Sequence, residues 1–244
     1  MGLRLLCVVA HPDDECFAFG GALALAADAG VETTVICLTD GQAAANRGSA
    51  TSAAHLGEMR REEYAASCRV LGVTHHETWD YHDGQLEFAD FSATAGRLVA
   101  TMRALRPHVV LTFGQDGSLN AHPDHTMVSA FTSAAFHWAA SAKRFPSLGP
   151  IHHADRLYLQ SSSFFLEGRP APIPAPWTVT LDVRAVMERR HEAFRQHKSQ
   201  APLMEQTKAT FERLGQNEHY VLAAAREPQP TRQTTSLFEG LRVG

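Results

Sequence analysis

The amino-acid sequence predicts an α/β fold, a Rossmann-like three-layer sandwich with a mostly parallel sheet and an irregular C-terminal part. Two observations predict it. Strand-like and helix-like segments alternate through the first half of the chain, and two clusters of histidine and acidic residues each follow a predicted strand. Strands that alternate with helices form βαβ units, with helices on both faces of a parallel sheet. The length of 244 residues suits one large core, so we expect a single domain over residues 1–244.

The elements of the first half have clear local signals. The expected strands are 3–10, 31–39, 77–81 and 108–113, and the expected helices are 17–29, 56–71, 91–106 and 123–142. Gly30 and Gly72 follow the first two helices as stop signals, and Pro107 ends the third. Pro123 lies in the first turn of the fourth helix, where proline is favoured.

The second half has a weaker pattern. The expected strands are 156–161, 178–183 and 219–224, and the expected helices are 183–200 and 203–214. The proline-rich segment 169–176 cannot hold a helix, so we expect an extended surface loop. The polar tail, from about residue 228 to 235, is expected to be loose or to pack on a neighbour. A homo-oligomer is compatible with the sequence.

Composition narrows the classes of partner. With a net charge of −4, the chain has no basic footprint for nucleic acid or an anionic membrane. No apolar stretch approaches the roughly 20 residues that span a bilayer, and the short N-terminal apolar run, interrupted at His11, predicts no signal peptide. The four cysteines lack CxxC spacing, so we expect buried, reduced thiols and a cytoplasmic protein.

The first cluster is His11-Pro12-Asp13-Asp14-Glu15, directly after the first predicted strand. Sites in open α/β sheets form at the carboxyl ends of strands. Imidazole and carboxylate suit zinc, and a catalytic zinc commonly has three protein ligands plus water. His11 and Asp14 can share one ion, which leaves Asp13 free to act as a base, since adjacent acids in different environments can take different roles. Taken alone, the two aspartates would more readily be read as a helix cap.

The second cluster, His122-Pro123-Asp124-His125, favours a metal site over a helix cap. One of its histidines can complete a His-Asp-His metal site while the other faces the substrate, and Asp124 can fix a histidine tautomer. The chain has 14 histidines, so a chance His-x-x-His is not rare. Two strand-end clusters that both carry His-Pro-Asp are much less expected by chance, and they predict a metal-dependent hydrolase.

In these motifs the chain resembles the LmbE-like/PIG-L family of zinc-dependent N-deacetylases. The resemblance spans roughly residues 3–200. Besides the two clusters, Arg60-Arg-Glu-Glu63 followed by Leu71-Gly72-Val73 is similar to the central helix of the family, and Asp83-Gly84 to its next loop. Members remove acetyl groups from N-acetylglucosamine conjugates, among them intermediates of mycothiol, bacillithiol and glycosylphosphatidylinositol synthesis. The resemblance therefore implies a small-molecule amidosugar substrate, hydrolysed to acetate and a free amine.

The resemblance also implies individual roles. The implied zinc ligands are His11, Asp14 and His125, a set that iron(II) also fits. Asp13 would be the general base. His122, acting best when protonated, would stabilise the tetrahedral intermediate, and Asp124 would orient or tune His122. The implied contacts to the sugar or its aglycone are Arg47, Arg60 and Asp83.

The chain departs from the family at two positions beside the second cluster. Ala121 stands where many members have glycine, and Asn120 stands where some have a tyrosine that helps to polarise the carbonyl. After residue 140 only Lys198-Ser199-Gln200 matches, so the resemblance does not carry the aglycone specificity.

Other histidines and acids have simpler interpretations. We expect His75, His76, His152 and His153 in solvated loops; His191 and His197 would lie at the surface or support the ligands.

Asp40 follows a strand as the ribose-binding acid of a dinucleotide fold does, but the first turn lacks GxGxxG, so no NAD site is expected.

Two alternative functions use the same residues. His11-x-Asp13 with a distant histidine also resembles the facial triad of non-haem iron(II) oxygenases, although those enzymes usually have an all-β fold. A non-catalytic binding protein on the same fold is the other alternative, which the intact set of base and ligands disfavours.

Overall fold

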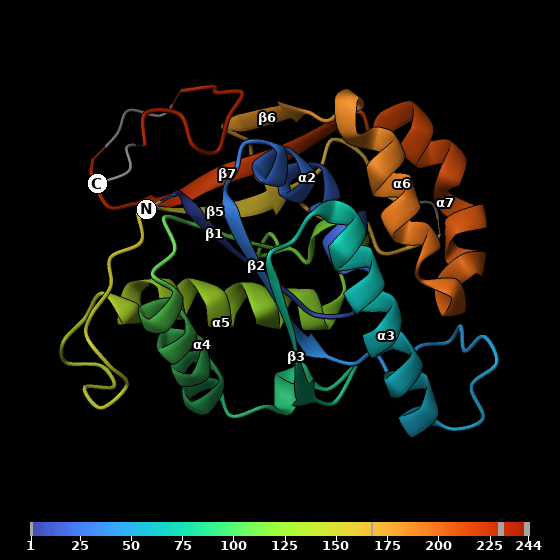
Figure 1. Cartoon of the computed structure of the whole chain (residues 1–244), viewed down its shortest axis with the longest axis horizontal. Helices are drawn as coiled ribbons and strands as arrows, with labels where there is room; N and C mark the ends of the chain where they lie inside the picture. The colour runs from blue at the N-terminus through green and yellow to red at the C-terminus, as the bar shows by residue number, and fades with distance from the viewer. Residues whose placement is uncertain (1, 167, 229–231, 242–244) are drawn as a thin grey trace.

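A seven-stranded sheet forms the centre of the molecule, with the strand order β3-β2-β1-β4-β5-β7-β6 (Figure 1). This computed structural model describes residues 2–166, 168–228 and 232–241. The strands are β1 (Arg4–Val9), β2 (Glu32–Thr39), β3 (His75–Tyr81), β4 (Val109–Thr112), β5 (Arg156–Ser161), β6 (Val179–Asp182) and β7 (Asn217–Ala225). The first five run parallel, and β7 is antiparallel to both of its neighbours. The predicted α/β fold with a mostly parallel sheet is confirmed.

Helices cover both faces of the sheet. They are α1 (Asp14–Phe17), α2 (Gly20–Asp28), α3 (Ala53–Leu71), α4 (Phe91–Leu105), α5 (Pro123–Ala139), α6 (Met187–Arg195) and α7 (Ala201–Leu214). Short 3-10 turns occupy Leu86–Phe88, Ser118–Asn120, Arg184–Val186 and Lys198–Gln200. In Figure 1, α4 and α5 pack together on one side of the sheet, and α2, α3 and α6 lie on the other. Every residue of β4, and all of β1 except Arg4, is buried, because helices cover these central strands on both faces.

The strand order reverses between β1 and β4. From β1 the chain proceeds outward to β2 and β3, and it then returns to β4 and β5 on the other side. In open α/β sheets, the crevice at such a reversal, outside the carboxyl ends of the strands, is where ligands bind. The segments that leave β1 and β4 carry the two histidine clusters. The topology therefore brings the two clusters to the same edge of the sheet.

The predicted helix 17–29 is wrong in detail, because the structure divides this part of the chain into α1 and α2, with a break at residues 18–19. The buried carboxylate of Glu218, from β7, accepts hydrogen bonds from Gly21 N at 2.7 Å and Ala22 N at 2.9 Å. These are free amides of the first turn of α2, which a distant carboxylate caps. A Cβ on Gly21 would lie 2.3 Å from Val183 Cγ1, so glycine is required for this close approach.

The predicted helix 183–200 is also wrong in its extent. Only α6 is α-helical, and 3-10 turns precede and follow it. The chain leaves helical geometry at His197, whose φ and ψ are −81° and 67°. The side chain of His197 hydrogen-bonds to Glu15, far away in the sequence, so tertiary contacts override the helical pattern here.

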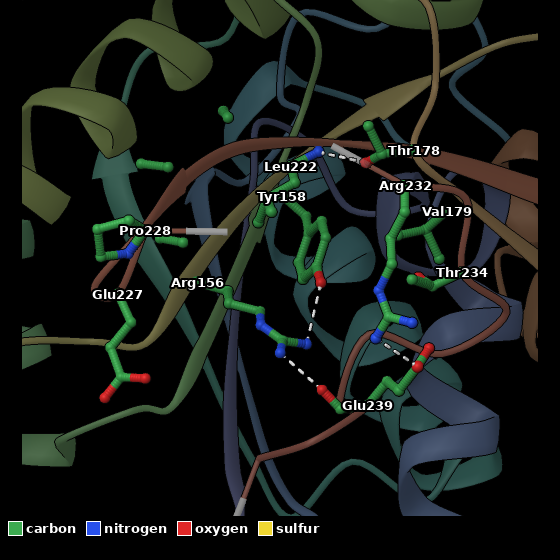
Figure 2. A pocket seen from close by; sticks show the side chains of 13 residues that line it. Arg156, Tyr158, Thr178, Val179, Leu222, Glu227, Pro228, Arg232, Thr234 and Glu239 are labelled. Carbon is green, nitrogen blue, oxygen red and sulfur yellow. Dashed lines mark hydrogen bonds and ion pairs between the residues drawn. The ribbon is translucent and has the colours of Figure 1, made fainter. Parts of the chain in front are cut away.

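The described part of the C-terminal tail packs on its own chain. Thr234 forms a β-bridge with Val179 of β6, and the side chain of Leu237 is buried. Figure 2 shows Arg156, at the start of β5, donating to the carbonyl oxygen of Glu239 at 2.6 Å; it also donates to that of Leu237, at 3.1 Å. A cavity of about 260 Å³ remains between this segment and the sheet. It adjoins the amino-terminal end of β5, the opposite edge from the histidine clusters.

Two further predictions concern the cysteines and membrane-spanning segments. All four cysteines are free and buried, as predicted. Across the described residues, no helix combines the length and the apolar character that crossing a membrane requires.

Candidate metal centre and active site

Three imidazole rings from the two clusters meet at the carboxyl ends of β1 and β4. The ring centroids of His11 and His122 are 4.7 Å apart, those of His11 and His125 5.4 Å, and those of His122 and His125 5.2 Å. One nitrogen of each ring lies within 4.8 Å of the others. Such a convergence of potential ligands from two distant parts of the chain is typical of a metal centre.

Asp14 lies between His11 and His125. Its Oδ1 is 3.2 Å from His125 Nε2, and its Oδ2 is 3.5 Å from His11 Nδ1. Oδ2 also accepts hydrogen bonds from Ala10 N at 3.2 Å and His11 N at 2.7 Å, which fix the carboxylate. Burial opposes ionisation, but the two histidines hold the pKa of Asp14 well below its usual value.

The other nitrogen of His11 is held by two carboxylates. Its Nε2 lies 3.1 Å from Asp83 Oδ1 and 3.1 Å from Asp124 Oδ2. Asp124 is itself fixed by the backbone amides of Gly84 at 2.7 Å and Leu86 at 3.1 Å. Although burial acts in the other direction, the hydrogen bonds that His11 makes to the carboxylates of Asp124, Asp14 and Asp83 raise the pKa of His11 well above its usual value.

These contacts differ from two of the expectations. Asp124 was expected to orient His122, but its carboxylate lies against His11. Asp83 was expected to contact the sugar, but one of its oxygens faces His11 and the other accepts a hydrogen bond from Ala43 N at 3.1 Å. The sequence cannot separate these roles, because Asp83, just after β3, and Asp124, in the first turn of α5, lie at the same edge of the sheet.

His125 is oriented in a similar way. Its Nδ1 lies 3.0 Å from the carbonyl oxygen of Gly117, which fixes the proton on Nδ1 in the neutral ring. The ring stacks on Phe113, with centroids 3.9 Å apart and planes only 3° from parallel. Its Nε2 is therefore free to act as a ligand, and it faces Asp14.

The residues fit a divalent metal ion. On each of His11 and His125, one ring nitrogen is occupied by a carboxylate or a carbonyl oxygen, and the other faces the Asp14 carboxylate. Metal-binding histidines usually donate their second N–H to such a partner. Asp14 thus presents its carboxylate oxygens to His11 and His125, and His122 lies within 4.8 Å of the same two histidines.

Asp13 stands beside this group in a strained conformation. Its φ of 111° and ψ of −26° lie in the left-handed region, which costs a residue other than glycine about 1–3 kcal/mol. Its Oδ2 accepts a hydrogen bond from Arg60 at 2.9 Å. Burial raises the pKa of Asp13 to about 6, and Arg60 opposes that rise. An acid with a pKa near the working pH suits general-base catalysis.

Arg60 and Arg47 have different surroundings. Arg60, on α3, was expected to contact substrate, yet its side chain is only 3% exposed. Besides Asp13, it donates to the carbonyl oxygens of Gly41, at 3.0 Å, and Pro12. Arg60 therefore holds the loop of the first cluster in place. Arg47 is exposed on the polar loop between β2 and α3.

His122 is the N-cap residue of α5. Its Nδ1 accepts a hydrogen bond from Asp124 N at 3.1 Å, so the neutral ring carries its proton on Nε2. Burial, together with the neighbouring His11 and His125, lowers the pKa of His122 to about 4. This differs from the expectation of a protonated His122, because the sequence does not show how closely the three rings approach. A neutral Nε2–H group still donates a hydrogen bond.

The two departures from the family pattern lie in the turn before α5. Ala121 has a φ of 48°, a conformation that glycine adopts without strain. The side-chain oxygen of Asn120 is buried and has no hydrogen-bond partner among the residues that the structure describes. Gly117 is required here, because a Cβ on it would lie 2.8 Å from the carbonyl carbon of Ala121.

Sequence reasoning missed a second buried group behind the site. Glu15, Ser67 and His197 are each at most 1% exposed and hydrogen-bond to one another. His197 is therefore not a surface residue. The sequence signal that could have identified it is its position next to residues 198–200, which match the family.

His152, expected in a solvated loop, is also buried, and its Nε2 lies 2.7 Å from the carbonyl oxygen of Pro107.

Comparisons with known proteins identify a family, sequence relatives and structural neighbours. A 1D-myo-inositol 2-acetamido-2-deoxy-alpha-D-glucopyranoside deacetylase of Rhodococcus jostii is 30% identical to the chain, covering 81% of each sequence. Among solved structures, an N,N'-diacetylchitobiose deacetylase from Pyrococcus horikoshii has a TM-score of 0.71 at 22% identity, covering 89% of this chain and 82% of that one. A 4-carboxy-2-hydroxymuconate hydratase from Pseudomonas putida has a TM-score of 0.69 at 20% identity, covering 93% and 99%.

The two structural likenesses concern the fold, and the fold is shared by enzymes of different chemistry. The family match is more specific, because it runs over residues 6–136, the part of the chain that holds both histidine clusters, Arg60 and Asp83. The chain belongs to the PIG-L family, described as GlcNAc-PI de-N-acetylase.

Proposed function

We propose that this protein is a metal-dependent hydrolase that removes the N-acetyl group from an N-acetylglucosamine-type sugar conjugate, giving acetate and a free amine. One observation carries the proposal. The free nitrogens of His11 and His125 face the Asp14 carboxylate, and the adjacent Asp13, with a pKa of about 6, is positioned as a base. Ligands beside a base are the arrangement that hydrolysis by an activated water requires.

Each group has a distinct part in the proposed reaction. A divalent ion held by His11, Asp14 and His125 would polarise the amide carbonyl and lower the pKa of a water molecule. Asp13, fixed by Arg60 at Oδ2, accepts the proton of the attacking water and then passes it to the leaving amine. The Nε2–H group of His122 donates a hydrogen bond to the developing oxyanion, a contact that commonly contributes about 10²–10³ in rate.

Zinc is the proposed ion, since two imidazoles and one carboxylate with an open position are typical of catalytic zinc sites. Iron(II) accepts the same ligands and is the alternative in cells. The substrate class is supported by the family description and by the Rhodococcus relative, whose name specifies an N-acetylated glucosamine linked to inositol.

Three alternative functions would give different results in an assay. A hydratase, such as the Pseudomonas neighbour on this fold, would add water to a carbon–carbon double bond and release no amine. An iron(II) oxygenase would consume oxygen. A binding protein would hold the sugar without turnover.

The test is an amine-release assay on two substrates, N-acetylglucosamine linked to inositol and N,N'-diacetylchitobiose, in anaerobic and aerobic buffer. We expect equal amounts of acetate and primary amine, independent of oxygen, lost after chelation and restored by added zinc. Turnover that needs oxygen, or binding of both sugars by the metal-loaded protein without acetate release, would contradict the proposal.

A further inference from the structure

We propose that Glu15, Ser67 and His197, here called the Glu15 clamp, form a buried positioning device that holds the backbone of Asp13 in its strained conformation and so aims the catalytic carboxylate. The inference rests on the proposed function, because it assigns Asp13 as the base. The hydrogen bonds of these side chains join Glu15 to Ser67, to His197 and to the Asp13 amide, and none of those found among the described residues goes to a proposed metal ligand.

The hydrogen bonds of the Glu15 clamp converge on the carboxylate of Glu15. The Oε2 atom of Glu15 accepts a hydrogen bond from Asp13 N at 2.9 Å. The Oε1 atom of Glu15 accepts from Ser67 Oγ at 2.5 Å and pairs with His197 Nε2 at 2.7 Å. Both carboxylate oxygens are therefore used, one to hold the clamp together and the other to hold the Asp13 amide.

Burial makes these contacts strong. The side chains of Glu15 and His197 are both fully buried, and hydrogen bonds to a charged group are strongest where water is excluded. The strain at Asp13 is the reason that such a device is needed. A backbone held at a φ of 111° persists only if surrounding contacts determine it.

The clamp joins the site to a distant part of the chain. Two residues after His197, Ser199 donates two hydrogen bonds to Glu63 of α3, from N at 2.8 Å and from Oγ at 2.7 Å. The same helix carries Ser67 and Arg60. Asp13 is thus held at its amide by the Glu15 clamp and at its carboxylate by Arg60, and α3 supports both.

Glu15, Cys16 and His197 are also residues of metal-ligating types within 4.8 Å of one another. A metal is not needed to explain them. His197 and Glu15 are already paired at hydrogen-bond distance, and Cys16 Sγ donates to the carbonyl oxygen of Asp13 at 3.1 Å.

The experiment removes the clamp at its far end. In His197→Leu the donor to Glu15 is lost, whereas His197→Gln can restore an N–H donor near the position of Nε2. His152→Leu is the matched control, because His152 is another buried histidine with a 2.7 Å contact through Nε2, at the opposite edge of the sheet. Ser67→Ala removes one hydrogen bond of the clamp without a large cavity and serves if His197→Leu fails to fold.

We expect kcat to fall about 10- to 100-fold in His197→Leu, as misplacement of a reacting group by about 1 Å does. The KM and the bound zinc per chain should stay at parent values. Ser67→Ala should show a smaller loss of kcat, His197→Gln should recover most of it, and His152→Leu should keep the parent kcat. A parent-like kcat in both His197→Leu and Ser67→Ala would overturn the inference, as would a kcat loss in His152→Leu equal to that in His197→Leu.

A second readout does not depend on activity. In the metal-free protein labelled with ¹⁵N-aspartate, hydrogen exchange at the Asp13 amide should be faster in His197→Leu and Ser67→Ala than in the parent or in His152→Leu. Unchanged exchange would contradict the clamp. Because exchange requires no substrate, failure of the clamp and failure of the proposed deacetylation are separately visible.

Discussion

At the scale of single residues, the adjacent aspartates of the first cluster have opposite surroundings. Burial raises the pKa of Asp13 to about 6, whereas His125 and His11, acting against burial, lower the pKa of Asp14 well below its usual value. Asp14 faces two imidazoles and Asp13 faces Arg60. A permanently ionised carboxylate suits a metal ligand, and a carboxylate that titrates near neutral pH suits proton transfer.

Replacing each aspartate by asparagine should separate these roles. In Asp13→Asn, the size is kept but the base is lost, so we expect kcat to fall by about 10²–10⁴ with zinc still bound. In Asp14→Asn, zinc affinity itself should fall, because a neutral amide is a poorer ligand. Zinc content after dialysis, measured beside kcat, checks both. An Asp13→Asn protein that loses its zinc as readily as Asp14→Asn would contradict the assignment of Asp14 to the metal and Asp13 to proton transfer.

Activity should depend on pH through Asp13. The base must be ionised, so kcat/KM should rise with pH through about 6, the pKa of Asp13, and level off above it. His122, with its pKa lowered to about 4, stays neutral over this range and should cause no decline on the alkaline side. A pH profile of kcat/KM from 4.5 to 8.5 measures this. A decline between about pH 6.5 and 8 that disappears in His122→Gln would show instead that His122 acts protonated.

Arg60 should act on kcat through Asp13. Arg60→Met removes the hydrogen bond to Asp13 Oδ2 and a positive charge that lowers the pKa of Asp13. We expect a lower kcat, a nearly unchanged KM and an acidic limb displaced to higher pH. Arg103→Met is the matched control, because Arg103 is also 3% exposed and bonds only to carbonyl oxygens among the described residues. A raised KM with unchanged kcat would restore Arg60 as a substrate contact.

At the scale of elements, strand ends and helix starts build the site. The residues that follow β1, β3 and β4 supply His11, Asp83 and the turn before α5. The first turn of α2 depends on a partner from another element, because the buried carboxylate of Glu218 on β7 caps it. Since α2 follows α1 directly, this contact also anchors the cluster that precedes it.

Glu218→Gln should therefore destabilise the fold. One acceptor oxygen becomes a donor that faces backbone amides, and an unsatisfied buried group costs about 1–3 kcal/mol. We expect the free energy of unfolding in urea to fall by about that amount. The control is Glu188→Gln, since Glu188 is an exposed residue whose ion pair with Arg195 lies at the surface. Equal stabilities for the two variants would show that the cap contributes nothing.

At the scale of the whole molecule, the sequence predicted the architecture well, and the contacts within the site less well. Periodicity and stop signals located every strand, and β5 at its exact bounds of Arg156–Ser161, because these patterns are local. The division of 17–29 into two helices depends on Glu218, and the break at His197 depends on Glu15. Both partners are far away in the sequence, so no local pattern contains them.

The same distinction applies to the site. Spacing within each cluster, together with the reversal of strand order, brings His11, Asp14 and His125 together. The partners of Asp124 and Arg60 depend on side-chain direction. Asp124 lies on His11 rather than on His122, and Arg60 lies on Asp13 rather than at an open surface. The described part of the tail after residue 228 packs on the sheet of its own chain through backbone carbonyl groups. Every residue has such a group, so the sequence does not indicate this contact.

Amide hydrolysis by this protein is proposed to depend on one metal ion held by His11, Asp14 and His125. The most direct measurement is zinc titration of chelator-treated protein, with bound metal and amine release from the best N-acetylglucosamine conjugate recorded on the same samples. We expect activity to rise in proportion to bound zinc and to saturate at one ion per chain, whereas His11→Ala should neither bind zinc at this site nor release amine. Full activity in metal-free protein, or a full equivalent of zinc retained by His11→Ala, would contradict it.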